Sequence, residues 1–374
     1  MSVRGRAGRA VAGALGIAVV GAAAEVARRR RVISRRGAGE DVAFGSLRSD
    51  PITVVADDGV PLHVEIDELE GDRAAAEEAA RAARKRRPPR AEAVPDPSAL
   101  TVVFAHGYAL NLDCWHFQRA AYRGLVRTVL YDQRSHGRSG RSGDGHATID
   151  QLAHDLKQVL DTTCPDGPVV LVGHSMGGMT IIALAEHYPE LFGSRVAGVA
   201  LISTTAGGLD PHRILVPVLP STVGGQLAQR LVATLARGHR TVDGLRKAGK
   251  SVASVVTDLF AFGDEVPASY VEFVDAMLSA TPFEVVAEFF PQFATLDKYA
   301  TVHALGAVPT TIICGTRDRI TSVGHSRKLH SVIPGSTLLE CEGAGHLVVL
   351  ERHDQVNAAL DQLLAAAADR VGPR

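Results

Sequence analysis

The chain has 374 residues, 46% of them hydrophobic and 22% charged, and its formal net charge is −1. This length can bury the core of one large domain with an insertion, or of two modest domains. A charge so close to zero gives no general attraction to nucleic acid, so we expect no nucleic-acid partner. The four cysteines have no paired spacing, which indicates neither a zinc site nor a disulfide framework, and we expect no metal and no other cofactor. They are Cys114, Cys164, Cys314 and Cys341.

Residues 1–36 differ in charge from the rest of the chain. They contain nine arginines and one acid, Glu25, for a net charge of +8, which leaves −9 for the remainder. Residues 10–24, "AVAGALGIAVVGAAA", carry no charge and are followed by four arginines at 28–31. The apolar stretch is shorter than the roughly 20 residues that a spanning helix needs.

Three interpretations of this N-terminus stay open. It is an uncleaved membrane anchor or surface-lying helix, a cleaved export signal with Ala22 and Ala24 at the cleavage site, or a plain tail. The arginines that follow favour retention on the cytoplasmic side, because positive charge beside an apolar segment tends to stay there. We therefore expect a cytoplasmic protein, membrane-associated if residues 1–36 anchor it, with export as the alternative.

The next segments predict a hairpin and a solvated insertion. Residues 52–69 alternate apolar and polar side chains around Asp58-Gly59, which is typical of a β-hairpin. Residues 71–98 have no Phe, Ile, Leu, Met, Trp or Tyr and are rich in charge, so they have almost nothing to bury. We interpret 71–98 as a helical or disordered insertion between strands.

From residue 100 onward, short apolar runs alternate with amphipathic stretches. Such runs, bounded by Gly, Pro or Asp, are typical of strands buried on both faces of a parallel sheet. They are "LTVVFAHG", "RTVLYD", "PVVLVG", "VAGVALIS", "PTTIICG" and "STLLECEG". Helices are expected at 148–163, 176–188 and 350–368, and the alternation predicts a doubly wound α/β fold.

One interval interrupts this alternation. About 100 residues of helical character separate the strand ending at 203 from the strand that starts at 309, too many for one crossover helix. We predict a helical cap at 207–300, inserted into a core domain formed by 52–206 and 301–370.

The turn between the expected strand at 169–172 and the helix at 176–188 reads Gly173-His174-Ser175-Met176-Gly177. This is a G-x-S-x-G pattern in the strand-turn-helix context that a nucleophilic serine requires. The flanking glycines permit a tight turn that lifts the Ser175 hydroxyl out of the sheet edge. Gly178 extends the run of small residues and favours close packing of the helix.

A serine hydroxyl needs a base, and the base needs an acid that holds its tautomer. In this architecture both come later, each in a loop after a strand. Asp318 follows the strand "PTTIICG" and His346 follows "STLLECEG", so both loops open at the same sheet edge as Ser175. Asp297 and Asp210 also lie downstream of Ser175 as competing acids.

The negative oxygen of an acyl-transfer intermediate needs two N–H donors. One is the backbone N–H of Met176, directly after the serine. The other is expected from His106-Gly107-Tyr108, which follows the strand "TVVFA"; Gly107 permits close approach and the N–H of Tyr108 is the predicted donor.

From about residue 52 to 368 the chain resembles the α/β-hydrolase superfamily. "HGY", "DQRSHGRS", "GHSMGG", "GTRD" and "GAGH" occur in the order that this superfamily shows. The resemblance implies a Ser175, Asp318 and His346 triad, with Tyr108 and Met176 as oxyanion donors. The supporting motif residues are His106, Gly107, Gly173, His174, Gly177 and Gly178.

Two parts of the chain depart from the superfamily pattern. Ser135 stands at a common glycine position in "DQRSHGRS", where Asp132 and Arg134 are expected to fix the loop structurally. The basic N-terminus and the 71–98 insertion lie outside the pattern, so localisation does not follow from the resemblance.

The serine nucleophile speaks against the branches of the superfamily that need an aspartate, the epoxide hydrolases and haloalkane dehalogenases. We expect a carboxylic ester hydrolase of esterase or lipase type, acting on a small-molecule ester or lipid with an apolar acyl group. An acyltransferase, a thioesterase and a cofactor-free peroxidase-like enzyme are alternatives on the same triad. A non-catalytic small-molecule receptor is a more distant alternative.

Overall fold

The computed structural model describes residues 28–29, 31–36, 43–69, 100–143, 145–209, 257–258 and 260–371. The apolar stretch 10–24, the charged insertion 71–98 and residues 210–256 of the predicted cap lie outside the described residues. Among the helices that are described, none has the length and apolar character needed to cross a membrane.

The centre of the molecule is an eight-stranded sheet with the order β1-β2-β4-β3-β5-β6-β7-β8. β1 pairs antiparallel with β2 and β2 with β4, and all other neighbours are parallel. This confirms the predicted mostly parallel α/β sheet. The strands are β1 Pro51–Val55, β2 Pro61–Asp67, β3 Thr101–Ala105, β4 Arg127–Tyr131, β5 Val169–His174, β6 Val196–Ile202, β7 Thr310–Gly315 and β8 Thr337–Cys341.

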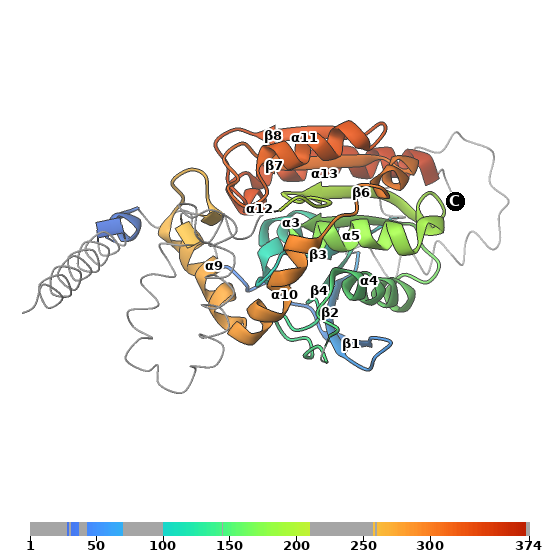
Figure 1. Cartoon of the computed structure of the whole chain (residues 1–374), viewed down its shortest axis with the longest axis horizontal. Coiled ribbons are helices and arrows are strands. Elements are labelled where there is room, and N and C mark those ends of the chain that lie inside the picture. The colour runs from blue at the N-terminus through green and yellow to red at the C-terminus, as the bar shows by residue number, and fades with distance from the viewer. Residues whose placement is uncertain are drawn as a thin grey trace, which may run out of the picture.

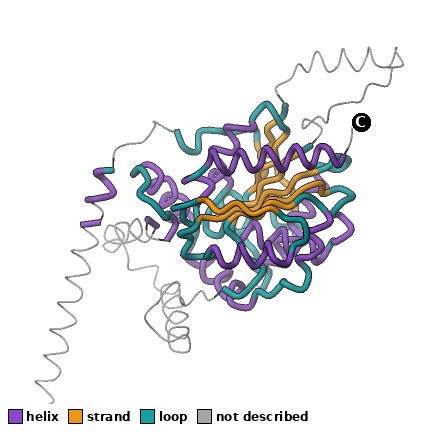
Figure 2. The backbone as a smooth tube through the Cα atoms, turned by 90° about the horizontal axis from the view of Figure 1, so that it is seen from above, coloured by secondary structure: helices purple, strands orange, loops and turns teal. Residues whose placement is uncertain are grey.

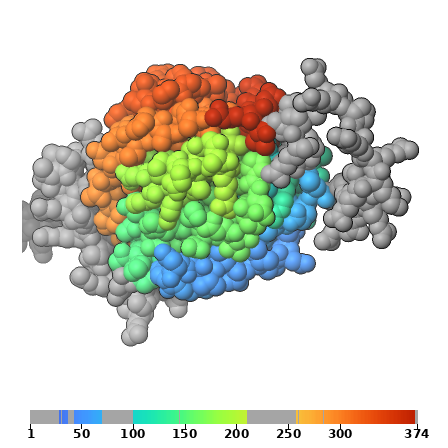
Figure 3. All heavy atoms as spheres, turned by 90° about the vertical axis from the view of Figure 1, so that its right-hand side faces the viewer, coloured from blue at the N-terminus to red at the C-terminus, as the bar shows by residue number. Residues whose placement is uncertain are grey.

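Burial along each strand follows its place in the sheet. Every residue of β3, β5, β6 and β7 is buried, as continuous apolar runs require when helices cover both faces. β1 is an edge strand with one buried residue, and Gly59 turns the β1–β2 hairpin at φ +86°. Figure 3 shows the blue N-terminal residues at one edge of the molecule and the orange-red C-terminal part at the other.

Helices cover both faces of the sheet, which lies in the middle of the view in Figure 2. α4 and α5 pack together on one face, and α3 and α13 pack together on the other. The predicted final helix is divided at Arg352 into α12 and α13. The α-helices of the core are α3 His116–Tyr122, α4 Ile149–Thr163, α5 Met176–His187, α11 Val323–Val332, α12 Val348–Glu351 and α13 His353–Val371. The 3-10 helices are η2 Leu112–Trp115, η3 Pro189–Leu191 and η4 Val302–Ala307.

The described part of the predicted cap includes two helices whose full bounds the structure gives. α9 Ala268–Ala280 and α10 Phe283–Thr295 follow one another at one end of the sheet (Figure 1). The buried side chains of α9 join the hydrophobic cluster that contains α3 and α13. Those of α10, including Phe289 and Phe293, join the cluster that contains α4 and α5. Each cap helix therefore extends one of the two cores, which holds the pair over the strand ends.

Candidate active site

Ser175 lies in a strained turn between β5 and α5. Its φ of +52° and ψ of −117° are rare for a residue with a side chain. Such a conformation costs about 1–3 kcal/mol and persists only where the surrounding structure imposes it. The N–H of Ser175 donates to the carbonyl of Ile202 on β6 at 2.9 Å, which ties the turn to the sheet edge.

The three glycines around the serine are required by close contacts. A Cβ on Gly173 would lie 2.6 Å from the backbone of Gly177, and one on Gly177 would lie 2.0 Å from the carbonyl oxygen of Ala105. A Cβ on Gly178 would lie 2.6 Å from the side chain of Thr204. Because real Cβ atoms do not approach other atoms so closely, α5 could not dock at this height on the sheet with larger residues.

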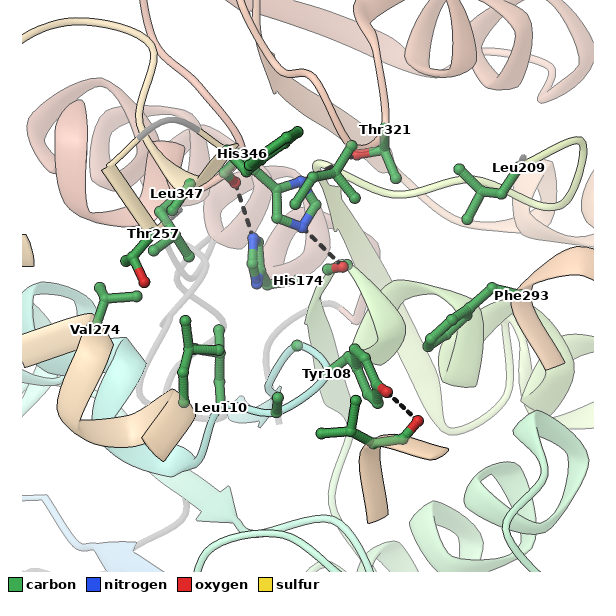
Figure 4. Close-up of a pocket in the computed structure, with 18 of the residues that line it drawn as sticks. Tyr108, Leu110, His174, Leu209, Thr257, Val274, Phe293, Thr321, His346 and Leu347 are labelled. Atoms are coloured by element: carbon green, nitrogen blue, oxygen red, sulfur yellow. Dashed lines mark hydrogen bonds between the residues drawn. The ribbon is translucent and has the colours of Figure 1, made fainter. Parts of the chain in front are cut away.

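The structure brings Ser175, His346 and Asp318 into one hydrogen-bonded chain. His346 Nε2 lies 2.9 Å from Ser175 Oγ, and His346 Nδ1 lies 2.9 Å from Asp318 Oδ2. Figure 4 shows the His346 ring with the contact to the serine oxygen as a dashed line. A carboxylate only accepts, so the Nδ1 proton faces Asp318 and the Nε2 lone pair faces the serine hydroxyl. This is the arrangement in which a histidine can remove the serine proton.

Asp318 is buried and held as a carboxylate by four donors. Besides His346, it accepts the backbone N–H groups of Ile320 at 2.8 Å and Thr321 at 2.9 Å, and the Thr321 hydroxyl at 2.8 Å. Burial alone would raise the pKa of Asp318, but His346 and these donors together bring it below its usual value. A side chain ionised at neutral pH can stabilise an imidazolium on His346.

The predicted oxyanion donors, Met176 and Tyr108, come from two backbone segments that meet at the serine. Met176 is the first residue of α5, where N–H groups have no partner within the helix. Gly107 approaches the turn so closely that a Cβ would lie 2.8 Å from His174 Nδ1 and 3.2 Å from Ser175 Cβ. The loop after β3 therefore passes directly beside the serine, as the oxyanion prediction requires.

His106 sets the orientation of the Gly107–Tyr108 peptide. Its Nε2 accepts the backbone N–H of Gln133 at 2.9 Å, so its proton is on Nδ1 and is donated to the Gly107 carbonyl at 2.7 Å. In a trans peptide the carbonyl and the next N–H point in opposite directions. Pinning the Gly107 carbonyl therefore aims the Tyr108 N–H to the other side. Burial lowers the pKa of His106 to about 4, so this histidine stays neutral.

His174 connects the serine turn to the histidine loop. Its Nε2 donates to the backbone carbonyl of His346 at 3.0 Å, which Figure 4 shows as a second dashed line. Burial lowers the pKa of His174 to about 3, so the ring is a neutral donor and does not compete with His346 for a proton.

The serine opens into a cavity of about 410 Å³ with apolar walls. Its lining includes Ser175, His346, Gly107 and Tyr108, together with side chains of α9 and α10. Figure 4 shows Leu110, Val274, Phe293 and Leu347 around this space. The other apolar lining residues include Met179, Leu209, Phe260, Leu278, Val286, Phe290 and Ile320. The cavity thus offers mainly apolar surface to a group bound beside Ser175.

One group of side chains in the described part of the chain has the spacing of a metal site. Asp150, Glu186 and His187 lie together at the C-terminal end of α5, opposite to the end that carries Ser175. The ammonium of Lys298 contacts Asp150 at 2.6 Å and also contacts Glu186, so a cation of the protein already lies between these two acids.

Two supporting residues were not predicted from the sequence. Thr321 donates its hydroxyl to Asp318, and Glu351 accepts the backbone N–H groups of Gly345 at 2.6 Å and Gly263 at 3.0 Å. Glu351 thereby joins the loop of His346 to Gly263 in the predicted cap. The sequence marks Glu351 only as a single acid directly after the apolar run "LVVL". Asp132 and Arg134 fix their loop, as expected: Asp132 accepts the N–H groups of Leu112 and Arg138, and Arg134 pairs with Asp58 and Asp155.

Comparison of the sequence with known proteins indicates the same fold. The model of the alpha/beta hydrolase family matches residues 102–359. The chain is 26% identical to 3-oxoadipate enol-lactonase 2 of Acinetobacter baylyi over 266 residues, which cover 70% of this chain and 88% of the lactonase. It is 28% identical to a monoacylglycerol lipase of Mycolicibacterium smegmatis over 184 residues, which cover 46% of this chain and 65% of the lipase.

Solved structures show the same architecture. A thermophilic esterase from Thermogutta terrifontis superposes with a TM-score of 0.63 at 22% identity, covering 86% of this chain and 100% of the esterase. The enol-lactonase from Burkholderia xenovorans LB400 superposes with a TM-score of 0.60 at 23% identity, covering 84% and 99% of the two chains. At these identities the likeness concerns the fold alone.

Proposed function

This chain belongs to the alpha/beta hydrolase family, and on that premise we propose that it hydrolyses carboxylic esters with apolar acyl groups through an acyl-enzyme on Ser175. The observation that carries the proposal is the hydrogen-bonded chain Ser175–His346–Asp318, which opens into an apolar cavity. Relatives named as a lactonase and a lipase act on ester bonds, which supports the same reaction class.

The first half of the reaction acylates the serine. His346 Nε2 removes the proton of Ser175 Oγ, and the oxygen attacks the carbonyl carbon of the ester. The carbonyl oxygen becomes negative and accepts the N–H groups of Met176 and Tyr108. His346 then gives the proton to the leaving alcohol, and the C–O bond of the ester breaks. Asp318 stabilises the imidazolium while the proton is on His346.

The second half removes the acyl group with water. His346 takes a proton from water, the hydroxide attacks the acyl carbon, and the same two N–H groups stabilise the negative oxygen. The bond to Ser175 Oγ breaks, the serine regains its proton from His346, and a carboxylic acid leaves. If an alcohol or amine attacked the acyl carbon in place of water, the acyl group would be transferred to that alcohol or amine.

The cavity supports an apolar acyl group as the substrate moiety. Its lining, as far as the structure describes it, contains aliphatic and aromatic side chains from both cap helices, and a volume of about 410 Å³ suits a small ligand. Residues 207–300 are proposed to act as the cap that provides this wall, with 52–206 and 301–370 as the catalytic core.

A panel of p-nitrophenyl esters of increasing acyl length tests this function. We expect the wild-type protein to release p-nitrophenol, with kcat/KM rising and then falling as the acyl chain outgrows the cavity, and Ser175→Ala to lose this activity. Product analysis in the presence of alcohols and amines separates hydrolysis from acyl transfer, and a thioester substrate tests the thioesterase alternative. Ligand binding without any turnover, or equal turnover by Ser175→Ala, would contradict the proposal.

A further inference from the structure

Two side-chain hydrogen bonds cross from the cap to the loop that carries the predicted oxyanion donor. The Tyr108 hydroxyl donates to the backbone carbonyl of Val286 in α10. The Thr281 hydroxyl, between α9 and α10, donates to the backbone carbonyl of Ala109 at 3.0 Å. Both bonds therefore join α9–α10 to residues 108–109 after β3.

The loop needs such support because its own conformation is unfavourable. Ala109 has a φ of +57°, in the left-handed region that residues with a side chain seldom adopt. The N–H of Leu110 donates back to the Gly107 carbonyl at 3.2 Å, which closes a tight turn around Tyr108 and Ala109. Strain of this kind is retained only where neighbouring groups hold the backbone in place.

The cap contacts the ring of Tyr108 in addition to its hydroxyl. It meets Phe293 of α10 edge to face, with ring centroids 4.9 Å apart and an interplanar angle of 74°. It also lies near His136, at 6.1 Å. Burial raises the pKa of the Tyr108 phenol, so its hydroxyl stays protonated and remains a donor. In Figure 4 this hydroxyl points away from His346 and toward the cap carbonyl.

We propose that Tyr108 and Thr281 are positioning residues through which the cap fixes the oxyanion loop, so that the N–H of Tyr108 meets the negative oxygen only when α9 and α10 are seated. This inference rests on the proposed function, since it assigns that N–H to the transition state. The side chain of Tyr108 acts through its own backbone and does not need to touch the substrate.

The variants Tyr108→Phe and Thr281→Val remove one hydroxyl each and keep the shape of the side chain. Tyr122→Phe is the matched control for the first, because the buried Tyr122 hydroxyl bonds Asn357 and Asp361 away from the cavity. Thr295→Val is the control for the second, because the Thr295 hydroxyl bonds carbonyls within α10 itself. Thermal unfolding of all four variants checks that each is folded.

The readouts are kcat and KM for a p-nitrophenyl ester and the Ki of an alkyl trifluoromethyl ketone. Ser175 adds to this ketone and places a negative oxygen where the transition state has one. Loss of a whole oxyanion donor costs about 10²–10³ in kcat. For the partial misplacement of one donor we expect kcat to fall about tenfold in Tyr108→Phe and several-fold in Thr281→Val. The Ki of the ketone should rise by the same factor by which kcat falls, while KM changes less than about twofold. The two control variants should match the wild type in kcat, KM and Ki.

The outcomes distinguish this inference from the proposed function. If the wild type turns over the ester and both test variants keep its kcat and Ki, the positioning role is contradicted. The proposed ester hydrolase function is not affected by that result. A rise of KM alone in Tyr108→Phe also contradicts it, because the side chain would then serve only to bind substrate. If the wild type shows no turnover, or Ser175→Ala retains it, the hydrolase proposal fails and this inference fails with it.

Discussion

The Asp318 carboxylate fixes which nitrogen of His346 carries the proton. Because it accepts from Nδ1 at 2.9 Å, the lone pair of Nε2 is left to face Ser175 Oγ. An amide in place of this carboxylate could donate to Nδ1 and so stabilise the wrong tautomer. The hydrogen-bonding role of Asp318 can therefore be tested without changing its size.

The substitution Asp318→Asn should lower kcat by about 10⁴, with KM little changed, because the folded geometry is kept while the base is lost. Steady-state kinetics with a p-nitrophenyl ester measure this loss. Asp297→Asn is the control, because Asp297 is an exposed acid that also follows the serine in the chain. A fall of less than tenfold in Asp318→Asn would mean that another acid orients His346.

At the scale of elements, the close approach of α5 to β3 sets the height of the serine above the sheet. A Cβ on Gly177 would lie only 2.0 Å from the Ala105 carbonyl oxygen. The turn has no space to relax, because Gly173 and Gly178 are in contact with neighbouring atoms as well. Packing at this junction therefore determines both stability and the position of Ser175, the proposed nucleophile.

We predict that Gly177→Ala destabilises the protein by about 3 kcal/mol or more, since α5 must shift to admit one methyl group into a packed junction. Urea denaturation followed by circular dichroism measures the free energy of unfolding. Gly324 in α11 is the control, because a Cβ there would come no closer than 3.7 Å to a neighbouring atom. Gly324→Ala should therefore be neutral or stabilising by up to about 1 kcal/mol. Equal stability of the two variants would show that the junction is not tightly packed.

Sequence patterns identified the strands and the order of the three site residues, since buried strands and the G-x-S-x-G turn have strong local signals. Ser175, Asp318 and His346 each follow a predicted strand, and topology alone brings their loops to one edge. The contacts of Thr321, Glu351 and the Tyr108 hydroxyl could not be predicted in this way. They depend on how loops and cap helices pack across long sequence separations, and no local spacing encodes that packing.

At the scale of the whole molecule, three buried histidines make stability depend on pH. Burial lowers the pKa of His106 to about 4, and burial together with neighbouring histidines lowers the pKa of His136 and His174 to about 3. In the unfolded chain these groups titrate near a pH of about 6.5. Between about pH 6.5 and 4 the unfolded state therefore binds more protons than the native state, and stability falls as the pH is lowered.

Lowering the pH from about 7.5 to about 5 should reduce the free energy of unfolding by about 2 kcal/mol for each of these histidines. The variant His136→Phe removes one of them, so its loss of stability over this range should be about 2 kcal/mol smaller than that of the wild type. Urea denaturation at both pH values measures the difference. Buried acids with a raised pKa, such as Asp132 and Glu351, act in the opposite direction but are common to both proteins. The same pH dependence in both proteins would show that the pKa of His136 is not lowered in the native state.

At the same scale, α9 and α10 are joined to the sheet domain, because each extends one of its two hydrophobic clusters. The cap contacts both proposed catalytic loops, through Tyr108 and Thr281 on one side and through Glu351 on the other. In the proposed reaction, a substrate in this cavity would meet a serine whose base, acid and N–H donors are already held in place.

The most direct measurement is mass spectrometry of the intact protein after treatment with a fluorophosphonate, followed by peptide mapping. We expect one phosphonyl group per chain, on Ser175, with no labelling of Ser175→Ala and much slower labelling of His346→Ala. Absence of labelling in the folded wild-type protein, or a modified residue other than Ser175, would contradict it.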